Sequence, residues 1–262
     1  MATLASMMIL DFGEADIELG RVMAPGDLDG RWAVCHFVGY LFELSDGRRV
    51  MLDNGPNRRH IDEPMYEYGD SEFTQYLKPM LRREDDPQNR LAELNLTVDD
   101  IDLLVLSHTH FDHAGNTADF AGVDILIHKD AHAWGRERWD AGIPGGIPEF
   151  ASDGTRLQYQ LIDGDYEIAG GLTLLETPGH APGHMSVLAE LPASGAYLLA
   201  IDAIYSRFNQ ERDNYKASLD PALARRSAQR CIQIAAEHDA QIIYGHDPVQ
   251  WTSLRTAPSR YR

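Results

Sequence analysis

Short apolar runs separated by turn residues dominate the hydrophobic pattern of this chain. Runs of this kind, bounded by Gly, Pro, Asn and Asp, are typical of strands buried in a sheet. The pattern predicts strands at 34–44, 49–53, 103–106, 123–128, 172–177, 186–190, 197–201 and 241–244. It therefore favours a fold built mainly on sheets.

Other segments predict helices or irregular structure. The segment 220–235 begins with Asp-Pro, which suits the N-cap and first position of a helix, and its apolar residues recur at helical intervals. The stretch 71–94 is predicted to be largely helical, with its two prolines as breaks. The mixed Gly, Pro, Trp and acidic residues of 129–160 indicate a loop or short-helix insert. The order of these elements predicts an α/β sandwich with helices covering the sheet faces.

The composition is typical of a globular protein. The chain has 262 residues, of which 44% are hydrophobic and 24% charged, as is ordinary for a soluble globular protein. No apolar run approaches the roughly 20 residues that span a bilayer. The first ten residues show no basic region and no clear cleavage site, so no secretory signal is predicted. We expect one domain over residues 1–262, a cytoplasmic location and no membrane partner.

Charge and cysteine content exclude further classes. The formal charge is -18, from 23 basic and 41 acidic residues. Such a surface repels nucleic acid, whose phosphates are bound mainly by Lys and Arg. Cys35 and Cys231 share no metal-type spacing, and each suits a buried apolar position. We therefore expect neither nucleic-acid binding nor a disulfide framework.

Four potential metal ligands crowd into one segment directly after a predicted strand. They are His108, His110, Asp112 and His113. Imidazole and carboxylate groups are natural ligands of zinc and similar divalent ions. The alternative is a polar loop with scattered histidines, but gathering four such groups in one loop brings little structural benefit. The segment therefore predicts a metal site.

Three further potential ligands follow later apolar runs. His180 lies in a Pro-Gly-His turn, Asp202 follows the run at 197–201, and His246 follows the run at 241–244. Strand ends can bring residues that are distant in sequence to one rim of a sheet. One ion cannot use all of these ligands, so two adjacent ions are expected.

The His-x-His-x-Asp-His motif, followed in order by the later His, Asp and His, resembles the metallo-β-lactamase superfamily over nearly the whole chain. The resemblance implies an α/β fold of the four-layer αβ/βα sandwich type, with a dinuclear site along one edge. It also implies the ligand sets: His108, His110 and His180 for the first ion, Asp112, His113 and His246 for the second, and Asp202 with a water or hydroxide between them.

Two nearby features resemble the family pattern in supporting roles. Asp53-Asn54-Gly55 is similar to the family's Asp-x-Gly turn at a strand end, for which a structural role is expected. His184 is expected to act behind the ligands or to stabilise its turn, since outer groups commonly orient metal ligands.

Local features resemble the lactonase branch, whose members open N-acyl-homoserine lactones and so quench quorum sensing. Asp202-Ala-Ile-Tyr205 resembles the Asp-x-x-Tyr of that branch, and Pro-Gly-His-Ala-Pro-Gly-His is also similar. The resemblance implies that a hydroxide bridging the metals attacks the lactone carbonyl and that Tyr205 hydrogen-bonds the carbonyl or the developing alkoxide. Asp112 would pass a proton to the leaving group. The alternative for Tyr205 is an amphipathic residue at a strand end.

The metals and partners follow from the same resemblance. We expect two divalent ions, zinc first, although cobalt, manganese and iron also accept His and carboxylate ligands. A small-molecule lactone is the expected substrate, and a homodimer is the reasonable default. The alternative is another hydrolase on this scaffold, acting on other small lactones, organophosphate triesters or thioesters. A non-enzymatic metal-binding protein is the third interpretation.

Candidates for the acyl pocket rest only on location and residue type. They are Met23, Trp32, Phe111, Trp134 and Trp139. Core packing explains each of them at least as well. The segment Leu19 to Val34 matches the lactonase patterns poorly, which leaves the preferred acyl length open.

Overall fold

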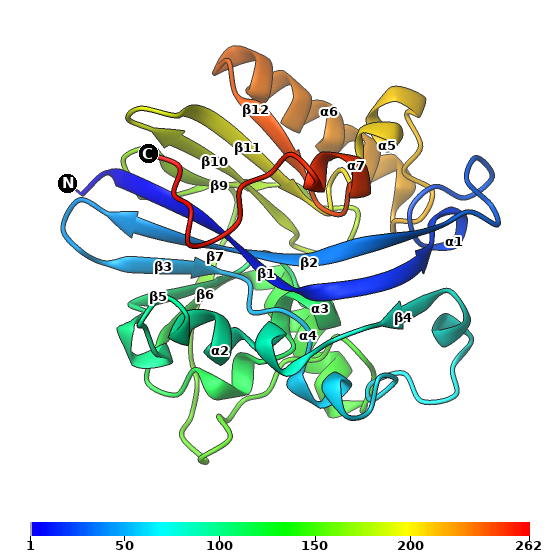
Figure 1. Ribbon diagram of the computed structural model, residues 1–262, viewed down its shortest axis with the longest axis horizontal. Coiled ribbons are helices and arrows are strands. Elements are labelled where there is room, and N and C mark those ends of the chain that lie inside the picture. Colours follow the sequence, from blue (N-terminus) through cyan, green and yellow to red (C-terminus); the bar gives the residue numbers. More distant parts are fainter. Residues whose placement is uncertain (1) are drawn as a thin grey trace.

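The computed structural model describes residues 2–262, which form two sheets packed face to face with helices on both outer surfaces (Figure 1). Across this range the first sheet has seven strands in the order β4-β1-β2-β3-β5-β6-β7. They are β1 (Leu4–Glu18), β2 (Trp32–Leu44), β3 (Arg49–Leu52), β4 (Leu77–Pro79), β5 (Leu103–Leu106), β6 (Asp124–His128) and β7 (Gln158–Ile162).

The second sheet, within the same described residues, has five strands in the order β12-β11-β10-β9-β8. They are β8 (Tyr166–Ala169), β9 (Leu172–Glu176), β10 (Met185–Leu191), β11 (Gly195–Ile201) and β12 (Gln241–Tyr244). Both sheets are mixed: β3, β5, β6 and β7 run parallel in the first, and β11 runs parallel to β12 in the second.

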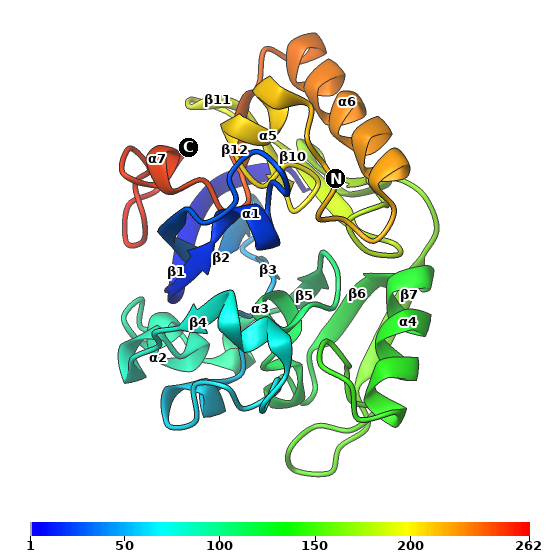
Figure 2. The same cartoon turned by 90° about the vertical axis from the view of Figure 1, so that its right-hand side faces the viewer.

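Helices connect and cover the strands. The α-helices are α1 (Leu19–Val22), α2 (Pro87–Ala92), α3 (Phe111–Ala114), α4 (Lys129–Asp140), α5 (Arg207–Arg212), α6 (Pro221–Glu237) and α7 (Pro248–Trp251). Short 3-10 helices lie at Arg58–Ile61, Glu72–Gln75, Arg83–Asp85, Val98–Asp100 and Thr117–Asp119. Figure 2 shows α4 and α6 on opposite outer sides of the paired sheets. Within the part of the chain that is described, no helix is long and apolar enough to cross a bilayer.

The strand sequences explain the layers. Met7 and Ile9 of β1 face the core between the two sheets, whereas Met8 and Leu10 face the helices on the outer side of the first sheet. Successive side chains of a strand point to opposite faces, so a strand covered on both faces is apolar throughout. A further core lies between α6 and the outer face of the second sheet. The predicted four-layer α/β sandwich is confirmed.

Each of the eight predicted strands has a counterpart in the structure, and the 241–244 run coincides with β12. The sequence did not predict β1, β7 or β8. The prediction for 71–94 was wrong in its main point, because Leu77–Pro79 forms β4 at the edge of the first sheet, beside β1. The segment pairs with the otherwise unpaired edge of β1, and its prolines interrupt a helix. The 129–160 interpretation understated α4, a helix of 12 residues. Its start is capped by His128, whose Nδ1 accepts the Asp130 amide at 3.2 Å.

Candidate metal centre

The seven candidate ligands meet where strands of both sheets end. His108 and His110 follow β5, and Asp112 and His113 lie on α3, the short helix that continues this loop. The other three follow strands of the second sheet: His180 after β9, Asp202 after β11 and His246 after β12. The predicted rim of strand ends is therefore formed by two sheets rather than one.

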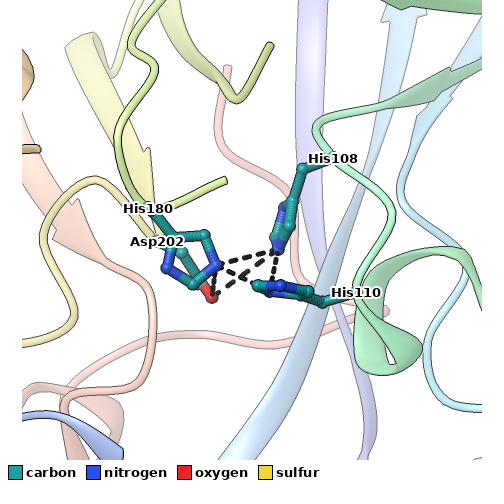
Figure 3. Close-up of side chains that lie close together, drawn as sticks. All are labelled: His108, His110, His180 and Asp202. Carbon is teal, nitrogen blue, oxygen red and sulfur yellow. Dashed lines mark hydrogen bonds and ion pairs between the residues drawn. The ribbon is translucent and has the colours of Figure 1, made fainter. Parts of the chain in front are cut away.

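Three imidazoles of the first group converge on one point (Figure 3). His108 Nε2 lies 3.0 Å from His110 Nδ1, and His180 Nε2 lies 2.8 Å from His110 Nδ1 and 3.2 Å from His108 Nε2. Nitrogen ligands held about 2 Å from one tetrahedral zinc ion stand roughly 3.3 Å apart. The group therefore fits a single metal ion.

The second group, Asp112, His113 and His246, is similarly compact. Asp112 Oδ2 lies 3.5 Å from both His113 Nε2 and His246 Nε2. All three residues are buried. Mixed nitrogen and oxygen donors of this kind suit zinc and other first-row divalent ions.

Asp202 lies between the two groups. Its Oδ2 atom is 3.2 Å from His180 Nε2 and 3.6 Å from His113 Nε2, whereas its Oδ1 atom is 3.2 Å from His246 Nε2. The contact with His246 is an ion-pair distance without hydrogen-bond geometry, and Asp202 Oδ1 and His113 Nε2 are buried without a hydrogen bond among the described residues. Buried polar atoms are normally satisfied, so these orphaned atoms fit a centre that binds metal.

Burial fixes the protonation of the first group. Burial lowers the pKa of His108 and His180 well below the usual range, and it lowers the pKa of His110 to about 3. These imidazoles are therefore neutral at physiological pH, which is the form that binds metal. In the second group, burial favours a neutral His113, but the nearby carboxylates of Asp112 and Asp202 outweigh it and raise the His113 pKa.

Asp53 contributes more than the structural turn expected of it. Its backbone has a φ of 61°, and its carboxylate accepts hydrogen bonds from the Ser107 amide at 2.8 Å and the Ser107 hydroxyl at 2.7 Å. The same carboxylate lies 2.8 Å from His113 Nδ1. A proton held on Nδ1 by this contact leaves Nε2 free to bind metal. The parallel pairing of β3 with β5 carries Asp53 to this point, and the sequence motif alone showed only the turn.

His184 takes the supporting position expected for it. Its Nε2 accepts a hydrogen bond from the Asp202 backbone amide at 3.1 Å, and its Nδ1 lies 3.1 Å from the Thr177 carbonyl oxygen. This fixes the backbone of Asp202 and ties it to the turn that carries His180.

Tyr205 is buried and lies beside the first group. Its hydroxyl is 2.9 Å from His180 Nδ1. If His180 Nε2 serves as a ligand, Nδ1 carries the proton and donates a hydrogen bond to the tyrosine oxygen. The phenol proton then remains free to donate elsewhere. Burial raises the Tyr205 pKa well above the usual range, with the charges of Asp202 and Asp112 adding to the effect, so the phenol stays protonated.

A cavity of about 260 Å³ opens at this centre. Metal-group side chains such as Asp112, His180 and Asp202 line it together with Tyr205. Much of the remaining wall is apolar: Ile17, Val22, Phe73, Leu77 and Leu219. A chamber with an apolar wall and a few convergent polar groups is the usual form of a small-molecule site.

The five acyl-pocket candidates separate in the structure. Met23 and Phe111 line the cavity at the metal centre. Trp134 packs edge-on against His110, with ring centroids 5.5 Å apart, and Trp139 lines a second cavity behind Phe111. Trp32 was a wrong candidate: it is 42% exposed, and Lys78 Nζ lies 4.5 Å from its ring centroid.

The cysteines take no part in this site. Both are buried, as the sequence predicted, and burial raises the pKa of Cys35 to about 12 and that of Cys231 to about 11. A thiol is a nucleophile or metal ligand in its thiolate form, so neither residue is activated for chemistry.

Comparison with known proteins decides the family. The model of the metallo-beta-lactamase superfamily matches residues 38–249. The chain belongs to this superfamily. Within it, an N-acyl homoserine lactonase from Bacillus thuringiensis is 33% identical over 84% of this chain and 84% of its own length. The N-acyl homoserine lactonase AttM from Rhizobium radiobacter is 32% identical over 86% of this chain and 87% of its own. The predicted resemblance to the lactonase branch is confirmed.

Solved structures of this superfamily agree over the full chain. An N-acyl homoserine lactone hydrolase with the product N-hexanoyl-L-homoserine at its catalytic metal centre is 28% identical. It gives a TM-score of 0.86 and covers 99% of this chain and 100% of its own. A mutant of the Bacillus thuringiensis lactonase AiiA with N-decanoyl-L-homoserine at its active site gives the same TM-score of 0.86 at 27% identity, with 99% and 100% covered.

Proposed function

We propose that this chain is a dinuclear metal-dependent lactonase that opens the ester bond of N-acyl-homoserine lactones and thereby quenches quorum sensing. The observation that carries the proposal is one constellation: two ligand groups that both lie close to Asp202, with Tyr205 beside them on the wall of a cavity with many apolar residues. The lactonase relatives, two of them solved with bound ring-opened products, support it.

The ligand roles proposed here are those that the family pattern implies. His108, His110 and His180 hold the first ion, and Asp112, His113 and His246 hold the second, with Asp202 between them. We propose zinc in both positions, because five imidazoles and two carboxylates form a typical zinc donor set. When bound, such ions supply water of lowered pKa and polarise a carbonyl oxygen.

The protein residues orient the lactone and manage its charge. The Tyr205 hydroxyl oxygen accepts a hydrogen bond from His180 Nδ1, so its own O–H remains free to donate. It donates to the lactone carbonyl oxygen as negative charge develops there. The apolar wall opposite, which includes Leu77 and Leu219, receives the acyl arm and excludes water. This arrangement suits a neutral substrate with a polar head and an aliphatic tail.

Asp112 completes the reaction by moving a proton. Its carboxyl group lines the cavity, and burial raises its pKa although His113 and His246 oppose this effect. It takes up the proton released as a water molecule adds to the lactone carbonyl carbon, and it passes this proton to the alkoxide that leaves when the ring C–O bond breaks. The product is the open acyl-homoserine, whose new carboxylate lies next to the ligand groups.

A hydrolysis panel on purified, metal-analysed protein tests the proposal. The substrates are N-hexanoyl- and N-decanoyl-homoserine lactone, γ-butyrolactone, δ-valerolactone, a glutathione thioester and a phosphotriester. We expect the two acyl-homoserine lactones to give the highest kcat/KM, and close to two zinc ions per chain. A clear preference for the thioester or the phosphotriester would assign the chain to another hydrolase class, and zinc-loaded protein without turnover would leave a metal-binding role.

A further inference from the structure

Arg138 of α4 brings a cation close to the metal centre. Its guanidinium carbon lies 4.4 Å from the centroid of the Trp134 ring. The same ring also packs against His110, at 5.5 Å between centroids. One aromatic ring therefore separates the guanidinium from a proposed metal ligand, and Arg138 lines the same cavity as Tyr205.

The guanidinium is held in place but its donors are mostly unused. Its Nε donates a hydrogen bond to the Pro144 carbonyl oxygen at 2.6 Å. In residues 2–262, neither of its terminal nitrogens has a protein acceptor and no carboxylate forms an ion pair with it. By contrast Arg136, two residues earlier on α4, bonds both the Ile147 carbonyl and the Asp140 carboxylate. Arg138 is thus a fixed cation with free donors facing a cavity.

The surroundings indicate what these donors meet. Much of the cavity that Arg138 lines is apolar, so a substrate arm lying there gains by burial and is oriented by the polar groups present. The chain carries a formal charge of -18, which disfavours the approach of an anionic substrate. A neutral oxygen on an otherwise aliphatic arm suits both the apolar wall and the negative charge of the chain, and it can accept hydrogen bonds from Arg138.

We propose that Arg138 is a specificity-determining residue that donates hydrogen bonds to an oxo or hydroxyl oxygen on the acyl arm of the lactone. This inference rests on the proposed lactonase function. It names the substrate class within that function: acyl-homoserine lactones whose chain bears an oxygen near the amide, favoured over the unsubstituted chain. A hydrogen bond from a charged donor accounts for about a tenfold preference.

The test compares two substrates that differ by one carbonyl, N-(3-oxohexanoyl)- and N-hexanoyl-homoserine lactone. The wild-type protein is expected to prefer the oxo substrate about tenfold in kcat/KM, mainly through a lower KM. In Arg138→Met, which keeps an unbranched apolar chain against Trp134, the preference should disappear because only the oxo substrate loses a partner. γ-Butyrolactone, which has no acyl arm, should be opened equally well by both proteins.

Arg136→Met is the matched control. It removes a guanidinium from the same helix, and with it a hydrogen bond to a backbone carbonyl, but from a side chain outside the cavity. It should keep the wild-type preference. A wild-type protein that opens both lactones equally, or an Arg138→Met variant that keeps the preference or loses all substrates in equal measure, overturns the inference and leaves the lactonase function intact. Wild-type protein that opens no lactone overturns both.

Discussion

At the scale of single residues, the proposed chemistry depends on Tyr205 more than on any other side chain outside the ligand groups. Its hydroxyl joins two roles, because it lies against His180 and also lines the cavity. The sequence pointed to the second role through the Asp-x-x-Tyr spacing. Only the structure shows the first, since the contact between residues 180 and 205 depends on where β9 and β11 end.

Replacing Tyr205 by Phe should lower kcat on an acyl-homoserine lactone by about tenfold or more, because the developing oxyanion loses a donor. Steady-state kinetics on metal-analysed protein measures this. Tyr197→Phe, on β11 and not among the residues that line the cavity, serves as the control and should leave kcat unchanged. A Tyr205→Phe variant with wild-type kinetics would remove this residue from the mechanism.

Glu67 is the residue for which the structure predicts a pH effect on stability. Its side chain is 18% exposed and lines the second cavity, of about 370 Å³, behind Phe111. Burial raises its pKa to about 7; the charge of Asp112 adds to this, and a hydrogen bond from the Gly145 amide opposes it. The folded protein thus binds this proton more tightly than the unfolded chain, so stability is lost as pH rises from about 4.5 to about 7.

Glu67→Gln should remove this loss, because the amide does not ionise. Wild type should lose about 2 kcal/mol more of its free energy of unfolding than the variant does when the pH is raised from 5 to 8. Urea unfolding of metal-free protein at both pH values measures the difference. An identical pH dependence in the two proteins would show that Glu67 ionises normally in the folded state.

At the scale of elements, α6 and the turn that carries His180 form one packed unit. The predicted Asp-Pro start of α6 is confirmed: the Asp220 carboxylate accepts the Leu223 amide at 2.9 Å. The Asp220 amide in turn donates to the Gly179 carbonyl oxygen at 2.8 Å. Gly179 has a φ of 125°, and a Cβ added there would lie 2.1 Å from the Ala224 amide nitrogen. The first turns of α6 can approach the ligand turn only because this residue is glycine.

Gly179→Ala should therefore force α6 away from the turn and shift His180. Gly195→Ala is the control, because Gly195 also has a positive φ of 81° but no described atom lies within 4 Å of its added Cβ. Both variants suffer backbone strain at a positive φ, but only Gly179→Ala adds a clash with described atoms. We expect Gly179→Ala to be less stable than Gly195→Ala by about 2 kcal/mol in denaturant unfolding and to bind metal more weakly. Equal stabilities would show that the turn adjusts freely.

At the scale of the whole molecule, the candidate metal centre joins the two sheets. The first sheet supplies the segment from His108 to His113, and the second supplies His180, Asp202 and His246. The inner core packs the same sheets together away from this edge. Metal bound at the edge would therefore stabilise the pairing of the sheets as well as the site.

Chelation should accordingly lower the melting temperature as well as abolish activity. A ligand that binds only the folded state stabilises it by about 4 kcal/mol at a thousand times its Kd. Calorimetry before and after dialysis against dipicolinate, followed by zinc addition, measures the loss and recovery. An unchanged melting temperature in protein shown to be metal-free would mean that the sheets hold the edge together unaided.

The sequence by itself determined the start of α6, the set of metal-ligand candidates and most of the strands, because these depend on local patterns. It did not predict β1, β7 or β8. Apolar periodicity, an Asp-Pro cap and the His-x-His-x-Asp-His spacing are all read within a few neighbouring residues. Tertiary structure decided the rest: the strand β4 within 71–94, the contact of Asp53 with His113, and the place of Arg138 beside the cavity. Each of these depends on which distant segments pack together, and no local pattern encodes a contact between residues that only the folding of two sheets brings within hydrogen-bonding distance.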